Sequence, residues 1–265
     1  MKIGIVGAAG RMGRMLLAAT VAADGAVLSG GTEAAGHPKM GQDLGRLVGG
    51  ADLGVALTAD PKALFAASDA VIDFTVPSAT ATHALLAAET GTHLVIGTTG
   101  LGAPHQDAVD RAAETVTIVQ AANFSIGVNL LLGLVERAAT ILDDSYDIEI
   151  LDMHHRHKVD APSGTALALA RAAAQGRGVE LDAVACKERD GIIGARPRGE
   201  IGIQTLRGGG VVGDHTVIFA DMGERVEIGH KAGSREIFAG GAVRAALWTA
   251  GQKPGLYSMQ DVLGF

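Results

Sequence analysis

The sequence predicts a two-domain protein of the α/β class, in which an N-terminal doubly wound parallel sheet precedes an α+β domain built on a mostly antiparallel sheet. Three observations predict this fold. Over the first 123 residues, short apolar runs alternate with alanine-rich helical runs. The first apolar run ends in a glycine-rich turn that leads directly into a helix. Between residues 200 and 232, strand-like runs are joined by glycine-rich turns without helices, which is typical of antiparallel sheets.

The first domain is expected to alternate strands with helices. The apolar runs that indicate strands lie at 2–6, 26–31, 53–58, 70–75, 93–99 and 116–121. The helical runs between them lie at 11–23, 77–90 and 104–114. Since the strands are apolar on both faces, they indicate a parallel sheet that helices cover on both sides.

The pattern changes after residue 123. The expected elements are a long helix at 125–142, a half-exposed alternating strand at 146–155, a helix with proline near its start at 162–175, several strands within 200–232 and a helix at 235–250. The last helix resembles those of the first half. We therefore expect residues 1–123 and 236–265 to form the first domain, and residues 124–235 the second.

Composition narrows the class of partner and the compartment. The net charge of −7 argues against nucleic acid as a partner, because phosphate binding favours a basic surface. The single cysteine, Cys186, excludes an intrachain disulfide framework and a cysteine-rich zinc site. The N-terminal run is too short for a signal peptide, and no uncharged apolar stretch approaches the roughly 20 residues of a spanning helix. We expect a cytoplasmic protein without membrane partners.

Three glycines stand between the first strand and the first helix. Gly7, Gly10 and Gly13 follow the spacing GxxGxxG in the segment GIVGAAGRMG. A tight turn there lets backbone N–H groups at the helix start approach a pyrophosphate, so the segment indicates a Rossmann-like dinucleotide site. The alternative is a tight turn that binds nothing.

An acidic residue is expected where the second strand ends, and Glu33 occupies that place. Its carboxylate can accept hydrogen bonds from both hydroxyls of an adenosine ribose, and it would repel a 2′-phosphate. The alternative is a solvated loop glutamate. Two further glycine turns, GTTG at 97–100 and AANFSIG at 121–127, also follow strands. The carboxyl ends of parallel strands are where ligands bind, so these turns could line a nicotinamide site, although each could be an ordinary connection.

The segment HHRHKVDAPSGTAL, residues 154–167, is a local basic cluster on an acidic protein. His154 and Lys158 share a face in a strand, and also in a helix at i, i+4, so both can address one ligand. A zinc site is a competing interpretation, because His155 and His157 have a common ligand spacing. The neighbouring Arg156 and Lys158 would repel the metal, and no third ligand follows, so we predict no metal.

A helix start follows the basic cluster. Pro162 suits a first helical turn, and Ser163, Gly164 and Thr165 then provide N–H groups and hydroxyls at the positive end of a helix. Together with Lys158 and His155, this helix start could hold a compact dianion. A nicotinamide cofactor would make the site that of a reductase. Hydride addition builds negative charge on the acceptor, and histidine is well placed in pKa to supply the proton.

These motifs resemble those of a known family. GAAGRMG, DFT, GTTG, AANFSIGVN, HHRHKVDAPSGTAL and GERVEIGHKAGSR are together similar to the 4-hydroxy-tetrahydrodipicolinate (dihydrodipicolinate) reductase family, over nearly the whole chain. The resemblance implies an NAD(P)H-dependent reduction of 4-hydroxy-tetrahydrodipicolinate to tetrahydrodipicolinate and water, in the diaminopimelate route to lysine. It also implies a homotetramer, joined through the sheets of the second domains, and a small dicarboxylate substrate.

The resemblance assigns roles to particular residues. His154 corresponds to the proton donor and Lys158 to the second catalytic group. The substrate-binding positions correspond to His155, Ser163, Gly164, Thr165 and Arg235. The cofactor-binding positions correspond to Gly7, Ala8, Ala9, Gly10, Arg11, Met12, Glu33, Phe74, Gly97, Thr98, Thr99, Ala121, Ala122, Asn123 and Phe124.

The choice between NADH and NADPH depends on one departure from the family pattern. Some members carry arginine directly after the ribose-binding acid, whereas this chain has Ala34 after Glu33. We therefore expect NADH to serve at least as well as NADPH, with Arg11, His37 or Lys39 as the residues that could compensate.

Two other functions compete with this interpretation. Another two-domain Rossmann dehydrogenase, for an amino acid or a semialdehyde, would share the glycine loop. An acylating semialdehyde dehydrogenase needs a nucleophilic cysteine, and Cys186 lies outside any glycine turn. A non-catalytic dinucleotide-binding protein would keep the loop but would have no need for His154 and Lys158.

Overall fold

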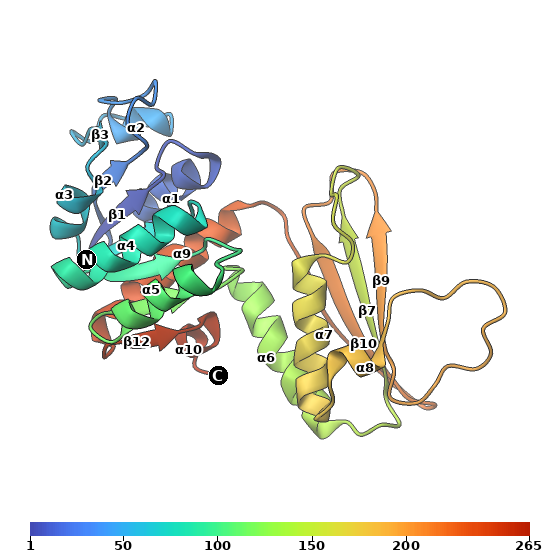
Figure 1. Cartoon of the computed structure of the whole chain (residues 1–265). Coiled ribbons are helices and arrows are strands. Elements are labelled where there is room, and N and C mark those ends of the chain that lie inside the picture. Colours follow the sequence, from blue (N-terminus) through green and yellow to red (C-terminus); the bar gives the residue numbers. More distant parts are fainter. The chain divides into compact units, whose positions relative to one another are not determined.

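The structure is a computed structural model that describes residues 1–265, and they divide into two compact units (Figure 1). The first unit comprises Met1–Ile126 and Glu236–Gly264, and the second comprises Gly127–Arg235 and Phe265. The sequence analysis expects Phe265 in the first domain instead. It belongs to the second unit because its ring packs on Gly133, where an added Cβ would lie 2.6 Å from the ring.

The first unit contains a seven-stranded parallel sheet in the order β12-β6-β5-β4-β1-β2-β3. Its strands are β1 (Lys2–Val6), β2 (Val27–Thr32), β3 (Leu57–Thr58), β4 (Ala70–Asp73), β5 (His93–Ile96), β6 (Thr117–Gln120) and β12 (Gly255–Tyr257). The strand order runs outward in both directions from β1 and β4, which confirms the doubly wound Rossmann-like prediction. Ligands bind such sheets at the carboxyl ends of the strands on either side of this reversal.

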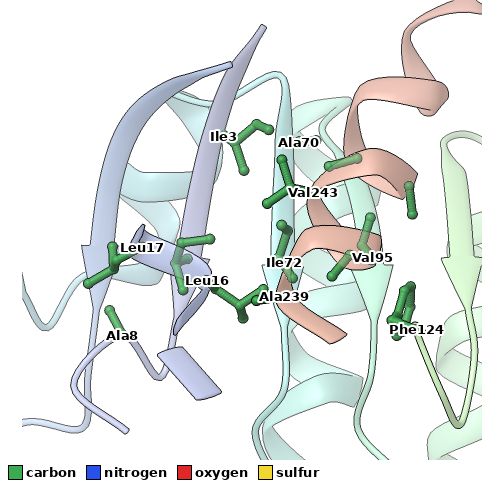
Figure 2. Close-up of a cluster of buried hydrophobic side chains, with 14 of the residues drawn as sticks. Ile3, Ala8, Leu16, Leu17, Ala70, Ile72, Val95, Phe124, Ala239 and Val243 are labelled. Carbon is green, nitrogen blue, oxygen red and sulfur yellow. The ribbon is translucent and has the colours of Figure 1, made fainter. Parts of the chain in front are cut away.

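Helices cover both faces of this sheet. α1 (Arg11–Ala22) packs against α9 (Glu236–Trp248), and their buried side chains share one cluster with β1 and β4 (Figure 2). α3 (Pro61–Ala66), α4 (Pro77–Thr90) and α5 (Ala103–Ala113) provide a second buried cluster. The remaining elements are α2 (Leu44–Leu47), a 3₁₀ turn (Thr249–Gly251) and α10 (Met259–Leu263). The apolar strands are thus buried on both sides, as predicted.

The strand expected at 53–58 is shortened to Leu57–Thr58. The carboxylate of Asp43 accepts hydrogen bonds from the backbone N–H groups of Leu53 and Val55, at 3.0 and 3.1 Å. Gly54, between them, has φ +72°, in the left-handed region. These contacts form a turn, so the N–H groups of the segment are not available to a sheet.

The second unit contains a five-stranded sheet in the order β11-β10-β7-β9-β8 (Figure 1). Its elements are α6 (Ile126–Ile141), which begins one residue before the unit, β7 (Asp147–His154), α7 (Gly164–Arg177), α8 (Leu181–Val184), β8 (Ala185–Cys186), β9 (Ile201–Arg207), β10 (Asp214–Ala220) and β11 (Arg225–Lys231). β10 is antiparallel to β7 and β11, whereas β9 runs parallel to β7 and β8. The parallel pairing arises because the crossover from β7 passes through α7.

The alternation of β7 determines which side chains face the helices. Ile148 and Ile150 belong to the buried cluster with α6 and α7, and Asp152 and His154 continue the same buried face toward the end of the strand. This face therefore changes from apolar to ionisable along β7. No helix in the structure combines the length and apolarity that crossing a membrane requires.

Candidate active site

The glycine loop of the first unit forms the turn that the sequence predicts. Gly7 has φ +66°, and the backbone around it packs so closely against α1 that a Cβ on Gly13 would lie 2.1 Å from the carbonyl oxygen of Gly7. Gly10 precedes the helix as its N-cap and uses no side chain to do so. The loop thus presents main chain at the helix start, which is the surface that a pyrophosphate requires.

Glu33 lies directly beside this loop. Its Oε2 accepts a hydrogen bond from the N–H of Ala9 at 3.2 Å, and its Oε1 accepts one from Ala34 at 3.1 Å. Ala34 and Arg11 are both exposed. The acidic side chain and the glycine loop, 24 residues apart in sequence, therefore form one surface at the ends of β1 and β2. This arrangement fits a dinucleotide whose adenosine ribose reaches Glu33.

The ends of β4 and β5 are tied together by a buried carboxylate that sequence reasoning missed. Asp73 Oδ1 accepts hydrogen bonds from the N–H of Thr75 at 2.9 Å and from the hydroxyl of Thr98 at 3.3 Å. Its Oδ2 accepts one from Nδ1 of His83 at 2.8 Å. Burial would raise the pKa of Asp73, but hydrogen bonds and the charge of His83 outweigh it and hold the pKa below its usual range. The turn at 97–100 is fixed by this network.

Two aromatic side chains of the predicted cofactor set lie together. The ring of Phe74 occupies the space beside Gly97, where a Cβ would come within 2.2 Å of it. The ring of Phe124 lies 5.4 Å from that of Phe74 and is almost fully buried. Phe124 therefore supports the site from the core, and only its backbone is available to a ligand. Thr99 and Ala122 are exposed at the neighbouring strand ends.

The second unit gathers ionisable side chains at the carboxyl end of β7. Asp152 Oδ1 lies 2.8 Å from Nδ1 of His154 and 3.3 Å from Nε2 of His215. Register explains the cluster, because His215 of β10 is paired with Asp152 and Arg207 of β9 is paired with His154. The rings of His154 and His215 meet edge to face, with centroids 5.2 Å apart. Three strands thus contribute to one buried group.

The same carboxylate also holds the start of α7. Oδ2 of Asp152 accepts a hydrogen bond from the N–H of Ser163 at 2.9 Å. Ser163 is the N-cap of α7, and its hydroxyl accepts a hydrogen bond from the N–H of Ala166 at 3.1 Å. The prediction that Pro162 occupies the first helical turn is wrong by two positions, because the helix begins at Gly164. The predicted anion site at this helix start lies next to His154 through Asp152.

The basic cluster is arranged differently from the sequence prediction. β7 ends at His154, so His154 and Lys158 share neither a strand face nor a helix face. A turn brings the N–H of Lys158 to the carbonyl of His155 at 3.1 Å, and the Lys158 ammonium pairs with Asp160 at 2.9 Å. The positive charge of Lys158 nevertheless acts on His154. The turn therefore leaves the charge of Lys158 near enough to His154 to lower the pKa of the imidazole.

Not every predicted residue joins this cluster. Arg156 and His157 are exposed, and the ring of His155 lies 6.2 Å from that of His157. Arg235 is exposed in the connection between β11 and α9, with no hydrogen bond or ion pair to the residues around Asp152. Within the cationic cluster at 154–158, His154 is thus buried, His155 and Lys158 are half-buried, and the other two residues are exposed.

The structure adds three residues that the sequence analysis did not single out, namely Asp152, His215 and Arg207. One signal for Asp152 was available, because it stands two residues before His154 in a strand-like alternation. His215 and Arg207 are distant in sequence, and only strand register brings them near. One carboxylate oxygen of Asp152 and one ring nitrogen each of His154 and His215 lie within 4.8 Å of one another. Arg207 faces the same carboxylate at 3.4 Å, so the group is a mixed ion-pair cluster.

Both units have known relatives. Residues 1–124 match the family described as "Dihydrodipicolinate reductase, N-terminus", and residues 127–263 match "Dihydrodipicolinate reductase, C-terminus". A 4-hydroxy-tetrahydrodipicolinate reductase of Parvibaculum lavamentivorans is 55% identical over 264 residues, covering 99% of this chain and 97% of that protein. The protein of the same name from Ruegeria pomeroyi is 53% identical over 260 residues, covering 98% and 97%.

A solved structure agrees with the sequence relatives. The dipicolinate-bound dihydrodipicolinate reductase of Paenisporosarcina sp. TG-14 superposes with a TM-score of 0.79 at 25% identity, and 98% of each chain is covered. The N-terminal and C-terminal models of one family thus match the two units, and relatives above 50% identity match the full chain. The chain belongs to the dihydrodipicolinate reductase family.

Proposed function

We propose that this chain transfers a hydride from a reduced nicotinamide dinucleotide to 4-hydroxy-tetrahydrodipicolinate, giving tetrahydrodipicolinate and water in the diaminopimelate route to lysine. The observation that carries the proposal is the position of His154. It is buried at the end of β7, paired with Asp152, whose carboxylate also holds the capped start of α7. A proton donor and an anion site are thereby joined through one side chain.

The proposed site residues of the second unit each have a chemical task. His154 donates the proton that balances the hydride, since a histidine can change charge near neutral pH. Lys158 and the first turn of α7 at Ser163, Gly164 and Thr165 attract the carboxylates of the substrate. His155 and Arg235 are proposed at the edge of the same site. A dicarboxylate suits this proposal because positive charge and helix N–H groups both attract carboxylates.

In the first unit, the glycine loop and Glu33 support binding of the dinucleotide, and the bound dinucleotide supplies the hydride. We propose that Gly7–Met12 approach its pyrophosphate, that Glu33 accepts hydrogen bonds from its ribose, and that Phe74, Gly97–Thr99 and Ala121–Phe124 line its nicotinamide end. NADH serves at least as well as NADPH in this proposal, because Ala34, next to Glu33, offers no charge to a 2′-phosphate.

Assembly is part of the same proposal. Helices α6 and α7 cover one face of the five-stranded sheet, while Leu151, Met153 and Ile218 are half-buried on the other face. That face supports association of second units into a homotetramer in the cytoplasm. Analytical ultracentrifugation measures the mass, and a monomer at micromolar concentration would contradict this part alone.

Turnover with enzymatically generated 4-hydroxy-tetrahydrodipicolinate tests the reaction, followed as oxidation of NADH and of NADPH in parallel. We expect oxidation that depends on substrate, with tetrahydrodipicolinate as the product. Oxidation of an amino acid or a semialdehyde instead would favour another dehydrogenase. Dinucleotide binding without any turnover would favour a binding protein.

A further inference from the structure

The carboxylate of Asp152 has no exposed surface and is contacted from four sides. Its Oδ1 faces the two histidines, His154 and His215, at 2.8 and 3.3 Å. Its Oδ2 accepts the hydrogen bond from the N–H of Ser163 and lies 3.4 Å from the guanidinium of Arg207. One buried side chain therefore connects β7, β9, β10 and the start of α7. A carboxylate in this position needs an explanation, because an uncompensated buried charge is strongly destabilising.

The charge state of Asp152 follows from its surroundings. Burial would raise the pKa of this carboxyl, but hydrogen bonds from His215 and Ser163 and the charge of His154 outweigh burial and hold the pKa well below its usual range. Asp152 is therefore ionised at neutral pH. No other group is hydrogen-bonded to Nδ1 of His154, which lies 2.8 Å from Oδ1 of Asp152. A protonated His154 thus has its counter-charge in direct contact.

The forces on His154 oppose one another. Burial lowers the pKa of His154, the charge of Asp152 raises it, and the positive charges of His215, Lys158 and Arg207 lower it, so that the pKa lies below its usual value. Asp152 is the one group in this set that favours the protonated ring. Nε2 of His154 lies on the opposite edge of the ring from Nδ1, beside Gly213, where a Cβ would approach it to 2.9 Å. The absence of a side chain at Gly213 leaves room for that edge of the ring.

We propose that Asp152 is a positioning residue that favours the protonated form of His154 and holds its ring through Nδ1, so that Nε2 is the donating atom, and that His215 opposes it by competing for the same carboxylate. The inference deepens the proposed function, since it assumes that His154 is the proton donor. A purely structural Asp152 that only holds Ser163 would stabilise α7 without affecting the protonation of His154. The two roles therefore differ in a measurable property.

The test is an NMR titration of His154 in the full-length protein, with the resonance assigned by its loss in His154→Gln. In Asp152→Asn we expect the titration of His154 to move to lower pH, because the favourable charge is removed. In His215→Gln and Arg207→Gln we expect it to move to higher pH. Asp152→Glu keeps the charge and should stay close to the parent. Asp214→Asn is the matched control, since Asp214 precedes His215 on β10 and its side chain projects from the other face.

The pH dependence of kcat/KM should follow the titration. At a pH above the titration, kcat/KM of Asp152→Asn should fall about tenfold for each pH unit of displacement, because the protonated fraction falls by that factor. Unchanged titrations in Asp152→Asn, His215→Gln and Arg207→Gln would overturn the positioning role. If Asp152→Asn does not fold, His154 titrations that equal the parent's in His215→Gln and Arg207→Gln would be enough to overturn the positioning role. Shifted titrations without any matching change in rate would uphold the Asp152–His154 relationship and contradict the proposed role of His154 as donor.

Discussion

Asp73 and His83 form a buried hydrogen-bonded pair in which Nδ1 of the imidazole lies 2.8 Å from the carboxylate. The pair joins the end of β4 to α4, and the same carboxylate fixes Thr75 and Thr98 at the two strand ends assigned to the cofactor. Since the pKa of Asp73 is held below its usual value, the ionised form stabilises the first unit. The pair therefore links the geometry of the strand ends to the acid stability of this unit.

Replacing Asp73 by Asn should lower the free energy of unfolding by about 3 kcal/mol at neutral pH, because a buried carboxylate that accepts several hydrogen bonds is lost. In the parent, the contribution of Asp73 is present above the ordinary aspartate pKa of about 3.9 and is lost as pH falls through the lower folded-state pKa. In the variant, the free energy of unfolding should not show this decrease at acid pH. Fluorescence of Trp248, the single tryptophan, follows urea unfolding of the first unit. The exposed Asp107→Asn is the control, and equal midpoints in both variants would contradict the prediction.

Replacing His154 by Gln should lower turnover by roughly 10²- to 10⁴-fold with little change in KM for the substrate, because a proton donor acts mainly in the transition state. The matched control is His157→Gln, which removes an exposed histidine from the same basic segment. Steady-state kinetics of the two variants decide the assignment. Turnover of His154→Gln within a few-fold of the parent would exclude His154 as the donor.

Cofactor choice should depend on the residue after Glu33. In the parent, kcat/KM with NADH should equal or exceed that with NADPH. Ala34→Arg should shift the ratio toward NADPH, because Ala34 is exposed beside the carboxylate and an arginine there would offset its repulsion of a 2′-phosphate. A preference of the parent for NADPH above about tenfold, on the order of 1.4 kcal/mol, would refute the expectation.

Local sequence patterns predicted the first unit well because its determinants are local. Apolar runs such as 2–6 and the glycine turn after them specify a strand, a tight turn and a helix without distant partners. Short elements such as β12 (Gly255–Tyr257) were not predicted, and the strand shortened to Leu57–Thr58 depends on hydrogen bonds from Leu53 and Val55 to Asp43. That capping pattern has no periodicity, so the apolar residues of 53–58 dominated the prediction.

The cluster around Asp152 was only partly predictable, since its geometry depends on strand register. The charge density of residues 154–158 indicated an anion site, which stays a prediction. The assumption of one regular element through residue 158 was wrong, because β7 ends at His154. His215 is placed beside Asp152 by the pairing of β10 with β7, a long-range property that no local pattern expresses.

The ammonium of Lys158, which pairs with Asp160 at 2.9 Å, should exchange this partner for a substrate carboxylate. Asp160 is exposed, so its ion pair is weak and little stability is lost when Lys158 turns to a ligand. Pyridine-2,6-dicarboxylate carries two carboxylates on a planar ring and accepts hydride poorly. It should therefore inhibit competitively against the substrate and bind more tightly once NADH is present.

Lys158→Ala should weaken both the inhibitor and the substrate by about tenfold to a hundredfold, since charge-assisted hydrogen bonds to carboxylates contribute roughly 1.5–3 kcal/mol each. Turnover should fall as well, because Lys158 is proposed to lie beside the reacting ring as the second catalytic group. Calorimetric titration of the dicarboxylate with NADH present compares the parent, Lys158→Ala and the control Arg156→Ala, which removes an exposed cation two residues away. Equal affinities in all three proteins would show that the anion site does not use Lys158, and the start of α7 would then have to bind the carboxylates without it.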